Sequence, residues 1–163
     1  VLGTSFHVKA ISESGGTEVA VVTGKVVVEK ASQPDSKGES GENRVVLTPN
    51  KKVTFFKDSE HYVTGLVENP VILDNHREYL KPQAFNFDES PVRMVLEKLE
   101  EAYGIEITLS NDQMLACPIT ADLSKDSLYE KLEIISAILN AHYEVTGASV
   151  LITGSGCEAS AKR

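Results

Sequence analysis

Residues that could do chemistry are present, but their spacing forms no recognisable catalytic or metal-binding pattern. Asp88 and Glu89 resemble an acid/base pair, yet acidic residues beside a predicted helix start are already explained by the helix dipole and the caps. No combination of Ser, His and Asp can be defended from its spacing. The histidines stand alone in predicted strands or loops, without a second ligand at metal-site spacing: His7, His61, His76 and His142. We therefore expect no enzyme, no metal and no cofactor, which leaves a binding or signalling module.

The two cysteines are Cys117 and Cys157, and their separation fits neither a metal site nor a close redox pair. A disulfide that ties down the C-terminal tail would need an oxidising compartment, and two free thiols are the favoured alternative. The segments "TGKV" and "TGSG" contain glycines, but they lack the length and flanking helix of a phosphate-binding loop.

The net charge of −8 is concentrated in the second half of the 163 residues. Residues 1–82 contain ten Lys and Arg against eleven Asp and Glu, whereas residues 83–163 contain six against thirteen. Nucleic acids and anionic membranes attract basic patches, so we expect neither as a partner. The acidic half suits a basic patch on a protein partner, or it is simply a solvated surface.

Two segments of this acidic half repeat one helical spacing, 36 residues apart. In the first, a cap at Ser90 and a left-handed end at Gly104 enclose one apolar face: Val92, Leu96, Leu99 and Tyr103. In the second, a cap at Asp126 or Ser127 and an end at Asn140 enclose the matching face: Leu128, Leu132, Ile135 and Leu139. With the alternating segments around them, residues 84–154 predict two strand–helix–strand units and an extra strand, with both helices packed on one sheet. The alternative is that any two such units look alike at this level.

The first half shows strand periodicity only. Alternating segments at 4–11, 17–24, 25–30 and 44–57 are joined by predicted turns at Gly24-Lys25 and Pro49-Asn50, each linking a strand pair. The polar stretch 31–43 predicts a mobile surface loop. Short strands without helical periodicity predict a small rolled or stacked β domain.

The predicted organisation is therefore two domains. We expect an all-β domain at 1–75, a connector at 76–84, an α+β domain at 85–155 and a polar tail at 156–163. Apolar runs are too short for a transmembrane helix or a signal peptide. Because the chain opens inside a predicted strand, we expect it to be a piece of a longer protein with any membrane anchor upstream.

Two passages resemble a known family. "VLGTSFHVKA", "EVAVVTGKVVV" and "VVLTPNKKVTF" are similar, in that order, to the periplasmic domain of FecR-type anti-sigma factors. "FNFDESPVRMVLEKLEEAYGIEITL" resembles the C-terminal domain of the Bacteroides-type members, a fold akin to the short signalling domain of secretins and TonB-dependent transporters. The chain departs from the family at Asn50, where Gly is usual, and in "YLKPQA", which replaces a Trp-containing connector.

The resemblance implies the periplasmic part of a single-pass inner-membrane regulator. Its N-terminal cytoplasmic domain, absent from this chain, would hold an extracytoplasmic-function sigma factor. The present part would bind the signalling domain of a TonB-dependent outer-membrane transporter, and that contact would trigger proteolysis and release of the sigma factor. The membrane would be contacted only through an upstream helix.

A small sheet keeps edge strands, and an edge strand offers backbone N–H and C=O groups to a partner strand. We expect edges at 119–123 and 149–153, beside an acidic helix face. The residues predicted to bind protein are Ile119, Thr120, Ala121, Val150, Leu151 and Ile152, with Glu97, Glu100 and Glu101. The alternative is a covered edge and a solvated helix face.

A periplasmic structural or binding module is the competing interpretation of the function. It would be a secretin-like ring subunit, which predicts self-association, or a glycan-binding β domain, which predicts exposed aromatic residues. The chain has only ten Phe and Tyr and no Trp, and most of them lie in predicted strands or helix faces.

Overall fold

The computed structural model describes residues 3–12, 15–29, 44–56 and 61–157. The chain divides into two compact units, residues 1–67 and 68–163. The predicted loop at 31–43 and most of the predicted tail, 158–163, lie outside the described residues. Within the described ranges, no helix combines the length and the apolar character that crossing a membrane requires.

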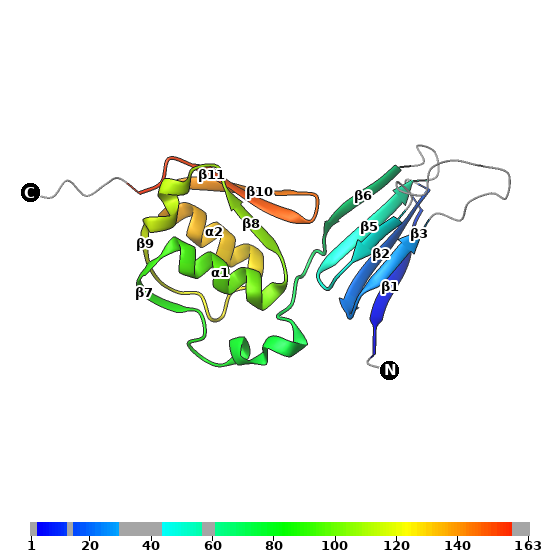
Figure 1. The fold of residues 1–163 in the computed structure, drawn as a ribbon, viewed down its shortest axis with the longest axis horizontal. Helices are drawn as coiled ribbons and strands as arrows, with labels where there is room; N and C mark the ends of the chain where they lie inside the picture. Colours follow the sequence, from blue (N-terminus) through cyan, green and yellow to red (C-terminus); the bar gives the residue numbers. More distant parts are fainter. Residues whose placement is uncertain (1–2, 13–14, 30–43, 57–60, 158–163) are drawn as a thin grey trace, which may run out of the picture. The chain divides into compact units, whose positions relative to one another are not determined.

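The first unit contains only strands among its described residues. Four of them form an antiparallel sheet in the order β1-β2-β5-β6, and the other two pair as an antiparallel ribbon, β3-β4 (Figure 1). Their bounds are β1 (Ser5–Ile11), β2 (Gly16–Thr23), β3 (Val26–Glu29), β4 (Arg44–Leu47), β5 (Lys51–Phe56) and β6 (His61–Leu66). The strand β6 lies outside the alternating segments that the sequence predicted.

The sheet and the ribbon share one apolar core. Val21 and Val53 of the sheet and Leu47 of the ribbon are almost fully buried together. Partly buried side chains from both layers pack against them: Val19, Val26, Val28, Val45 and Tyr62. The ribbon therefore covers part of one face of the sheet, which is a stacked β arrangement.

The two predicted turns are present, but neither joins a hairpin. Gly24 and Asn50 have positive φ angles of 79° and 64°, and the N–H of Lys51 donates to the carbonyl oxygen of Thr48. However, β2 pairs with β1 and β5, whereas β3 pairs with β4. The predicted pairing across each turn is wrong because alternation determines which side chains are buried, and it does not determine which strand becomes the neighbour.

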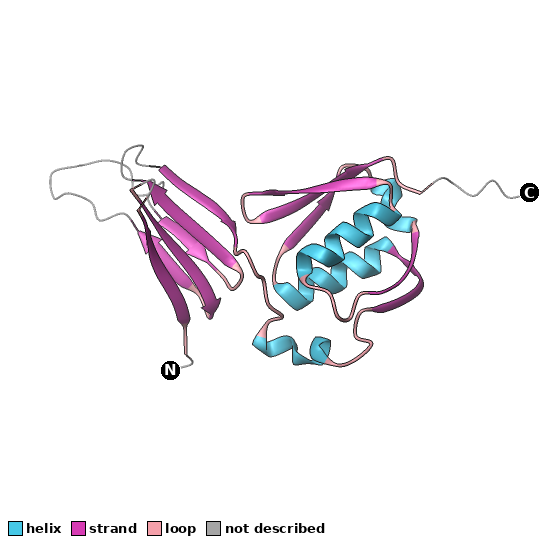
Figure 2. Ribbon diagram, turned by 180° about the vertical axis from the view of Figure 1, so that it is seen from behind, coloured by secondary structure: helices cyan, strands magenta, loops and turns pink. Residues whose placement is uncertain are grey.

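The second unit combines helices and strands, and α1 and α2 lie side by side in it (Figures 1 and 2). The unit begins with a 3₁₀ segment, η1 (Asp74–Leu80). The elements that follow are β7 (Asn86–Pro91), α1 (Val92–Tyr103), β8 (Glu106–Leu109), η2 (Asp112–Ala116), β9 (Pro118–Asp122), α2 (Leu128–Ile138), β10 (Ala141–Thr146) and β11 (Ser149–Gly154). The mixture of strands and helices confirms the α+β class for this chain.

The predicted apolar faces of both helices are confirmed. All eight side chains are buried: Val92, Leu96, Leu99 and Tyr103 on α1, and Leu128, Leu132, Ile135 and Leu139 on or just after α2. Both helices also end as predicted, because Gly104 (φ 65°) and Asn140 (φ 49°) adopt the left-handed conformation.

Of the two caps predicted for α2, Ser127 is confirmed and Asp126 is not, and the cap predicted at Ser90 for α1 is wrong. Ser127 and Glu130 form a capping box, in which each side chain accepts from the backbone N–H of the other residue. At α1, Pro91 occupies the cap position, and the hydroxyl of Ser90 donates instead to the carbonyl oxygen of Asp88. Pro91 has no N–H to be satisfied, so the start of α1 needs fewer cap bonds.

The predicted single sheet under both helices is wrong. The first strands of the two units, β7 and β9, pair with each other, while β10, β11 and β8 form a separate sheet in that order. The two sheets lie against different sides of the helix pair (Figures 1 and 2). A pair of helices has apolar surface on more than one side, so splitting the strands buries more of it than one sheet would.

One buried position of α2 is charged. Lys131 is 1% exposed and stands 36 residues after Val95, which is fully buried in α1. Its ammonium group donates to the carbonyl oxygen of Asp126 and lies 4.8 Å from the ring centroid of Phe85. Burial lowers the pKa of Lys131.

Candidate functional site

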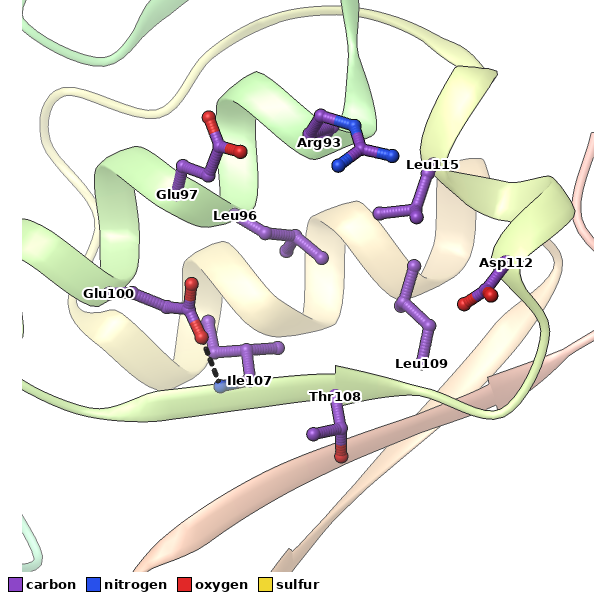
Figure 3. A pocket seen from close by; sticks show the side chains of 9 residues that line it. All are labelled: Arg93, Leu96, Glu97, Glu100, Ile107, Thr108, Leu109, Asp112 and Leu115. Carbon is purple, nitrogen blue, oxygen red and sulfur yellow. Dashed lines mark hydrogen bonds between the residues drawn. The ribbon is translucent and has the colours of Figure 1, made fainter.

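The candidate site is a groove between α1 and the outer edge of β8, which we call the β8 groove (Figure 3). It has a volume of about 320 Å³. The residues that line it are Arg93, Leu96, Glu97 and Glu100 of α1, Ile107, Thr108 and Leu109 of β8, and Asp112 and Leu115 of η2. A groove beside a strand edge can hold an extended segment of another protein.

The strand β8 is an edge strand. Among the described residues it pairs on one side only, in parallel with β11, in the sheet order β10-β11-β8. The N–H of Ser110 donates to Ile152 of β11 at 3.0 Å. Because backbone groups alternate along a strand, those of Ile107 and Leu109 face the groove instead.

A carboxylate closes part of this edge. The N–H of Ile107 donates to Oε1 of Glu100 at 2.7 Å, a contact that joins α1 to β8 (Figure 3). The distance is typical of a charge-assisted hydrogen bond. A side chain therefore occupies the place where the carbonyl oxygen of a further strand would lie.

The groove has an apolar floor and a charged rim. Leu96, Leu109 and Leu115 turn toward one another across it, whereas Thr108 points to the other side of β8 (Figure 3). Leu96 is buried, and the other two leucines are half-buried. Three carboxylates and one guanidinium line the groove, from Glu97, Glu100, Asp112 and Arg93, so its net charge is negative.

The structure separates the three predicted acidic residues. Glu97 and Glu100 lie in the β8 groove, but Glu101 faces the 3₁₀ segment η1. The hydroxyl of Tyr79 donates to Glu101 at 2.5 Å, and this hydrogen bond is the main reason that the pKa of Tyr79 rises to about 12. His76 Nδ1 lies 3.8 Å from the same carboxylate and 3.2 Å from Glu78. Glu101 therefore contributes to the attachment of η1 to α1.

The edge predicted at 149–153 is wrong. The strand β11 lies between β10 and β8, so its backbone groups are paired on both sides. Val150 and Ile152 are fully buried, and Leu151 is half-buried. The error has a physical source: an antiparallel hairpin with β10 and a parallel pairing with β8 leave the last strand in the centre, which its own sequence cannot indicate.

Residues 119–122 of the edge predicted at 119–123 lie in β9, which pairs with β7 in a two-stranded sheet. Ile119 is fully buried, Ala121 is half-buried and Thr120 is exposed. The Thr120 hydroxyl accepts from the N–H of Glu89, at a bulge where Glu89 has a φ of 44°. Glu89 and its neighbour Asp88 thus belong to β7, the strand that leads directly into α1.

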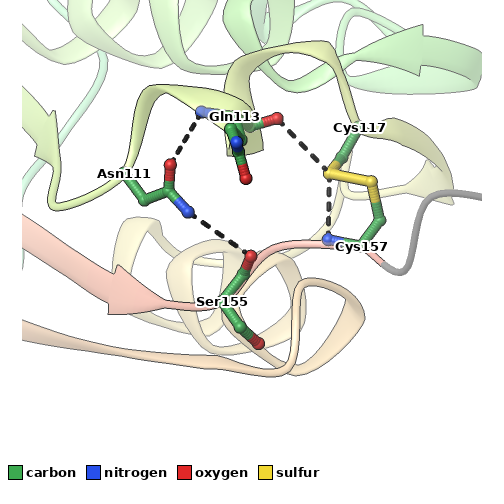
Figure 4. The surroundings of a disulfide bond; sticks show 5 residues. All are labelled: Asn111, Gln113, Cys117, Ser155 and Cys157. Atoms are coloured by element: carbon green, nitrogen blue, oxygen red, sulfur yellow. Dashed lines mark hydrogen bonds between the residues drawn. A yellow bond between two sulfur atoms is a disulfide. The ribbon is translucent and has the colours of Figure 1, made fainter.

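The cysteines form a disulfide, which corrects the expectation of free thiols (Figure 4). Cys117 follows η2 and Cys157 follows β11, and their Cα atoms are 5.7 Å apart. The N–H of Cys157 also donates to the sulfur of Cys117, and Asn111 donates to the carbonyl oxygen of Ser155 (Figure 4). The pairing was not predictable because it depends on β11 ending beside η2.

Sequence reasoning missed most of the groove. Arg93, Asp112 and Leu115 carried no recognisable motif, and Ile107 and Leu109 were identified only as strand residues. The available signal was the short spacing between an acidic helix and the strand that follows it. Among the described residues, no group of three His, Cys, Asp or Glu side chains could hold a metal ion.

Comparisons with known proteins find similarity to one family in the second unit. Residues 84–152 match the family described as "FecR, C-terminal". Two crystal structures of a proposed anti-sigma factor from Parabacteroides distasonis ATCC 8503, at 1.65 and 2.50 Å resolution, are similar to the chain. Their sequence identities are 25% and 24% and their TM-scores 0.41 and 0.42, with 95% and 96% of this chain covered. This chain spans 66% of each of those chains.

No curated protein matches the sequence significantly. The family match begins just before β7 and ends within β11, so it includes every residue that lines the β8 groove. The resemblance to FecR-type proteins is thereby confirmed for residues 84–152, which match the FecR C-terminal family.

Proposed function

We propose that the chain is the periplasmic signalling part of a FecR-type anti-sigma factor. In this proposal it receives a signal from the signalling domain of a TonB-dependent outer-membrane transporter and relays it to an extracytoplasmic-function sigma factor. The observation that carries the proposal is the match of residues 84–152 to the FecR C-terminal family. The sigma factor would be bound by a cytoplasmic domain that lies outside this chain.

Two further observations support the periplasmic location and the signalling role. The Cys117–Cys157 disulfide fits an oxidising compartment such as the bacterial periplasm. The open edge of β8, with a groove beside it, fits recognition of a partner by strand addition. The acidic rim of the groove would favour a partner whose docking segment is basic.

The proposal is tested with the purified signalling domain of the TonB-dependent transporter whose gene lies nearest. Titration calorimetry with the whole chain is expected to show one-to-one binding. In cells that carry the full-length regulator, deleting the transporter's signalling domain is expected to abolish the activity of a sigma-factor reporter. No binding and an unchanged reporter would overturn the proposed function.

A matched pair of variants tests the position of the site. Glu97 on α1 and Glu133 on α2 are both exposed and stand 36 residues apart, at equivalent positions of the two units. Glu97→Arg is expected to weaken binding of the signalling domain about tenfold, since it reverses a charge at the groove rim, whereas Glu133→Arg leaves binding unchanged. Equal effects of the two variants would place the contact elsewhere and leave the signalling role intact.

A further inference from the structure

A side-chain carboxylate occupies part of the outer edge of β8. Glu100 reaches from α1 and accepts the hydrogen bond of Ile107 at 2.7 Å, on the side of β8 that faces away from β11. In a sheet, a backbone N–H at this place donates to a carbonyl oxygen of the next strand. The Glu100 carboxylate thus satisfies a backbone donor that an added strand would also satisfy.

We infer that Glu100 is a displaceable gate, and that the β8 groove accepts an extended protein segment in which apolar and basic residues alternate. The inference rests on the proposed function and specifies the chemistry of the partner at that site. When the segment docks, one of its carbonyl oxygens takes the N–H of Ile107, and Glu100 is released.

The shape of the groove selects an extended segment. β8 offers the backbone groups of Ile107 and Leu109 along one edge, and the apolar floor lies directly beside that edge. Every second side chain of an added strand points to the same face, so alternate residues of the segment would enter the floor formed by Leu96, Leu109 and Leu115.

The charge of the groove selects a basic segment. Glu97, Glu100 and Asp112 outnumber Arg93, and Glu97 and Asp112 are exposed at the rim. Once released, the Glu100 carboxylate adds to the negative charge of the groove, and the net positive charge of a basic segment offsets it. An acidic or neutral segment would leave that charge uncompensated, so the gate discriminates against it.

The probe for this inference is a short synthetic peptide, blocked at both ends, that alternates valine with lysine. It is titrated into the isotope-labelled whole chain and followed by amide NMR. The peptide is expected to shift the amide signals of Ile107 and Leu109 first. A peptide in which glutamate replaces lysine is expected to bind at least about tenfold more weakly, because it meets the acidic rim.

Glu100 variants test the gate itself. Glu100→Ala is expected to speed hydrogen exchange at the Ile107 amide about tenfold and to narrow the advantage of the valine–lysine peptide over a valine–serine peptide, leaving the part that Glu97 and Asp112 contribute. Glu100→Gln keeps an acceptor oxygen, so Ile107 stays protected, but the preference for lysine falls. Glu101→Ala, one residue away and outside the groove, is the matched control and is expected to change neither measurement.

The possible outcomes separate this inference from the proposed function. If the transporter's signalling domain binds, but Glu100→Ala changes neither Ile107 exchange nor peptide preference, the gate is wrong and the signalling role stands. If the valine–lysine peptide binds at β8 and the signalling domain does not bind at all, the groove stands and the proposed function fails. Peptide shifts confined to β9 or β10 would overturn the inference.

Discussion

The ammonium group of Lys131 lies 4.8 Å from the ring centroid of Phe85 in the second unit. Phe85 and Lys131 are both 1% exposed or less, so this cation has almost no access to water. The ring face and the carbonyl oxygen of Asp126 partly replace the lost hydration. Even so, burial lowers the pKa of Lys131, because the loss of water destabilises the charged form relative to the neutral form.

Replacing this lysine by an apolar residue of similar length is expected to be tolerated. Lys131→Met removes a buried charge and keeps most of the volume, so the free energy of unfolding at neutral pH is expected to stay level or rise by about 1 kcal/mol. Lys131→Ala leaves a cavity and is expected to cost about 2 to 3 kcal/mol. Urea denaturation measures both, with exposed Lys125→Met as the control.

The pH dependence of stability gives an independent check on Lys131. Since its folded pKa is below the ordinary value of 10.5, the unfolded chain binds more protons between the two values. The wild-type protein is therefore expected to gain stability as the pH rises toward 10.5, relative to Lys131→Met. If the free energy of unfolding changed with pH in the same way for both proteins, the burial of the Lys131 ammonium group would be contradicted.

The disulfide is expected to be a major contributor to the stability of the second unit. Cys117 and Cys157 are 40 residues apart, and a loop of this size corresponds to about 4 kcal/mol of chain entropy in the unfolded state. Cys157→Ser is expected to lower the urea midpoint, and a reducing agent should lower the wild-type midpoint to the same value. If the reducing agent left the wild-type urea midpoint unchanged, the Cys117–Cys157 pairing would be contradicted.

The two helix starts provide a matched comparison of capping. Ser127→Ala removes the side-chain acceptor of a capping box and is expected to cost about 1 kcal/mol. Ser90→Ala, at the start of the other helix, is expected to cost much less because Ser90 caps nothing. Thermal unfolding of both variants measures the two losses of stability, and equal losses would show that Ser90 acts as a cap.

The capping box also has a pH signature. Hydrogen bonds from Ser127 lower the pKa of Glu130, so the carboxylate supports the helix at neutral pH and its contribution is lost as the pH falls through that lowered pKa. The stability difference between wild type and Ser127→Ala is therefore expected to shrink in acid. A difference that persists unchanged would separate the Ser127 effect from Glu130.

The pKa of Tyr79 reports on the contact between η1 and α1. The pKa of Tyr79 is raised to about 12 mainly by its hydrogen bond to Glu101, and the pKa of Tyr103 is raised to about 12 by burial. Glu101→Gln removes the carboxylate charge and is expected to bring Tyr79 closer to 10, while Tyr103 is unaffected. The difference between the ultraviolet titration curves of the variant and the wild type measures the change at Tyr79, and identical curves would exclude the contact.

The raised pKa of Tyr79 also determines how the stability of the protein changes with pH. Because its folded pKa lies above the ordinary value of 10.0, the folded protein retains the proton that the unfolded chain loses between 10.0 and about 12. The contribution of the Tyr79–Glu101 bond is thus complete below pH 10.0 and disappears as the pH rises through about 12.

Local periodicity was sufficient to predict the buried faces and the C-terminal ends of α1 and α2. The spacing of Val92, Leu96 and Leu99 identified the buried face of α1, and Gly104 and Asn140 identified both helix ends. These features depend on side chains one or two turns apart and on the φ angles that single residues tolerate. The same local motifs carry the resemblance to the FecR family, which the match of residues 84–152 confirms.

Only the tertiary structure decided which strands are neighbours. The alternation in 149–154 predicted a strand correctly, but its central position depends on contacts with β8 and β10, which lie before it in the sequence. The same is true of the Glu100–Ile107 hydrogen bond and of the Cys117–Cys157 disulfide. Side-chain alternation determines the buried face of each strand, whereas strand order depends on how both helices are covered together, and that is a property of the whole unit.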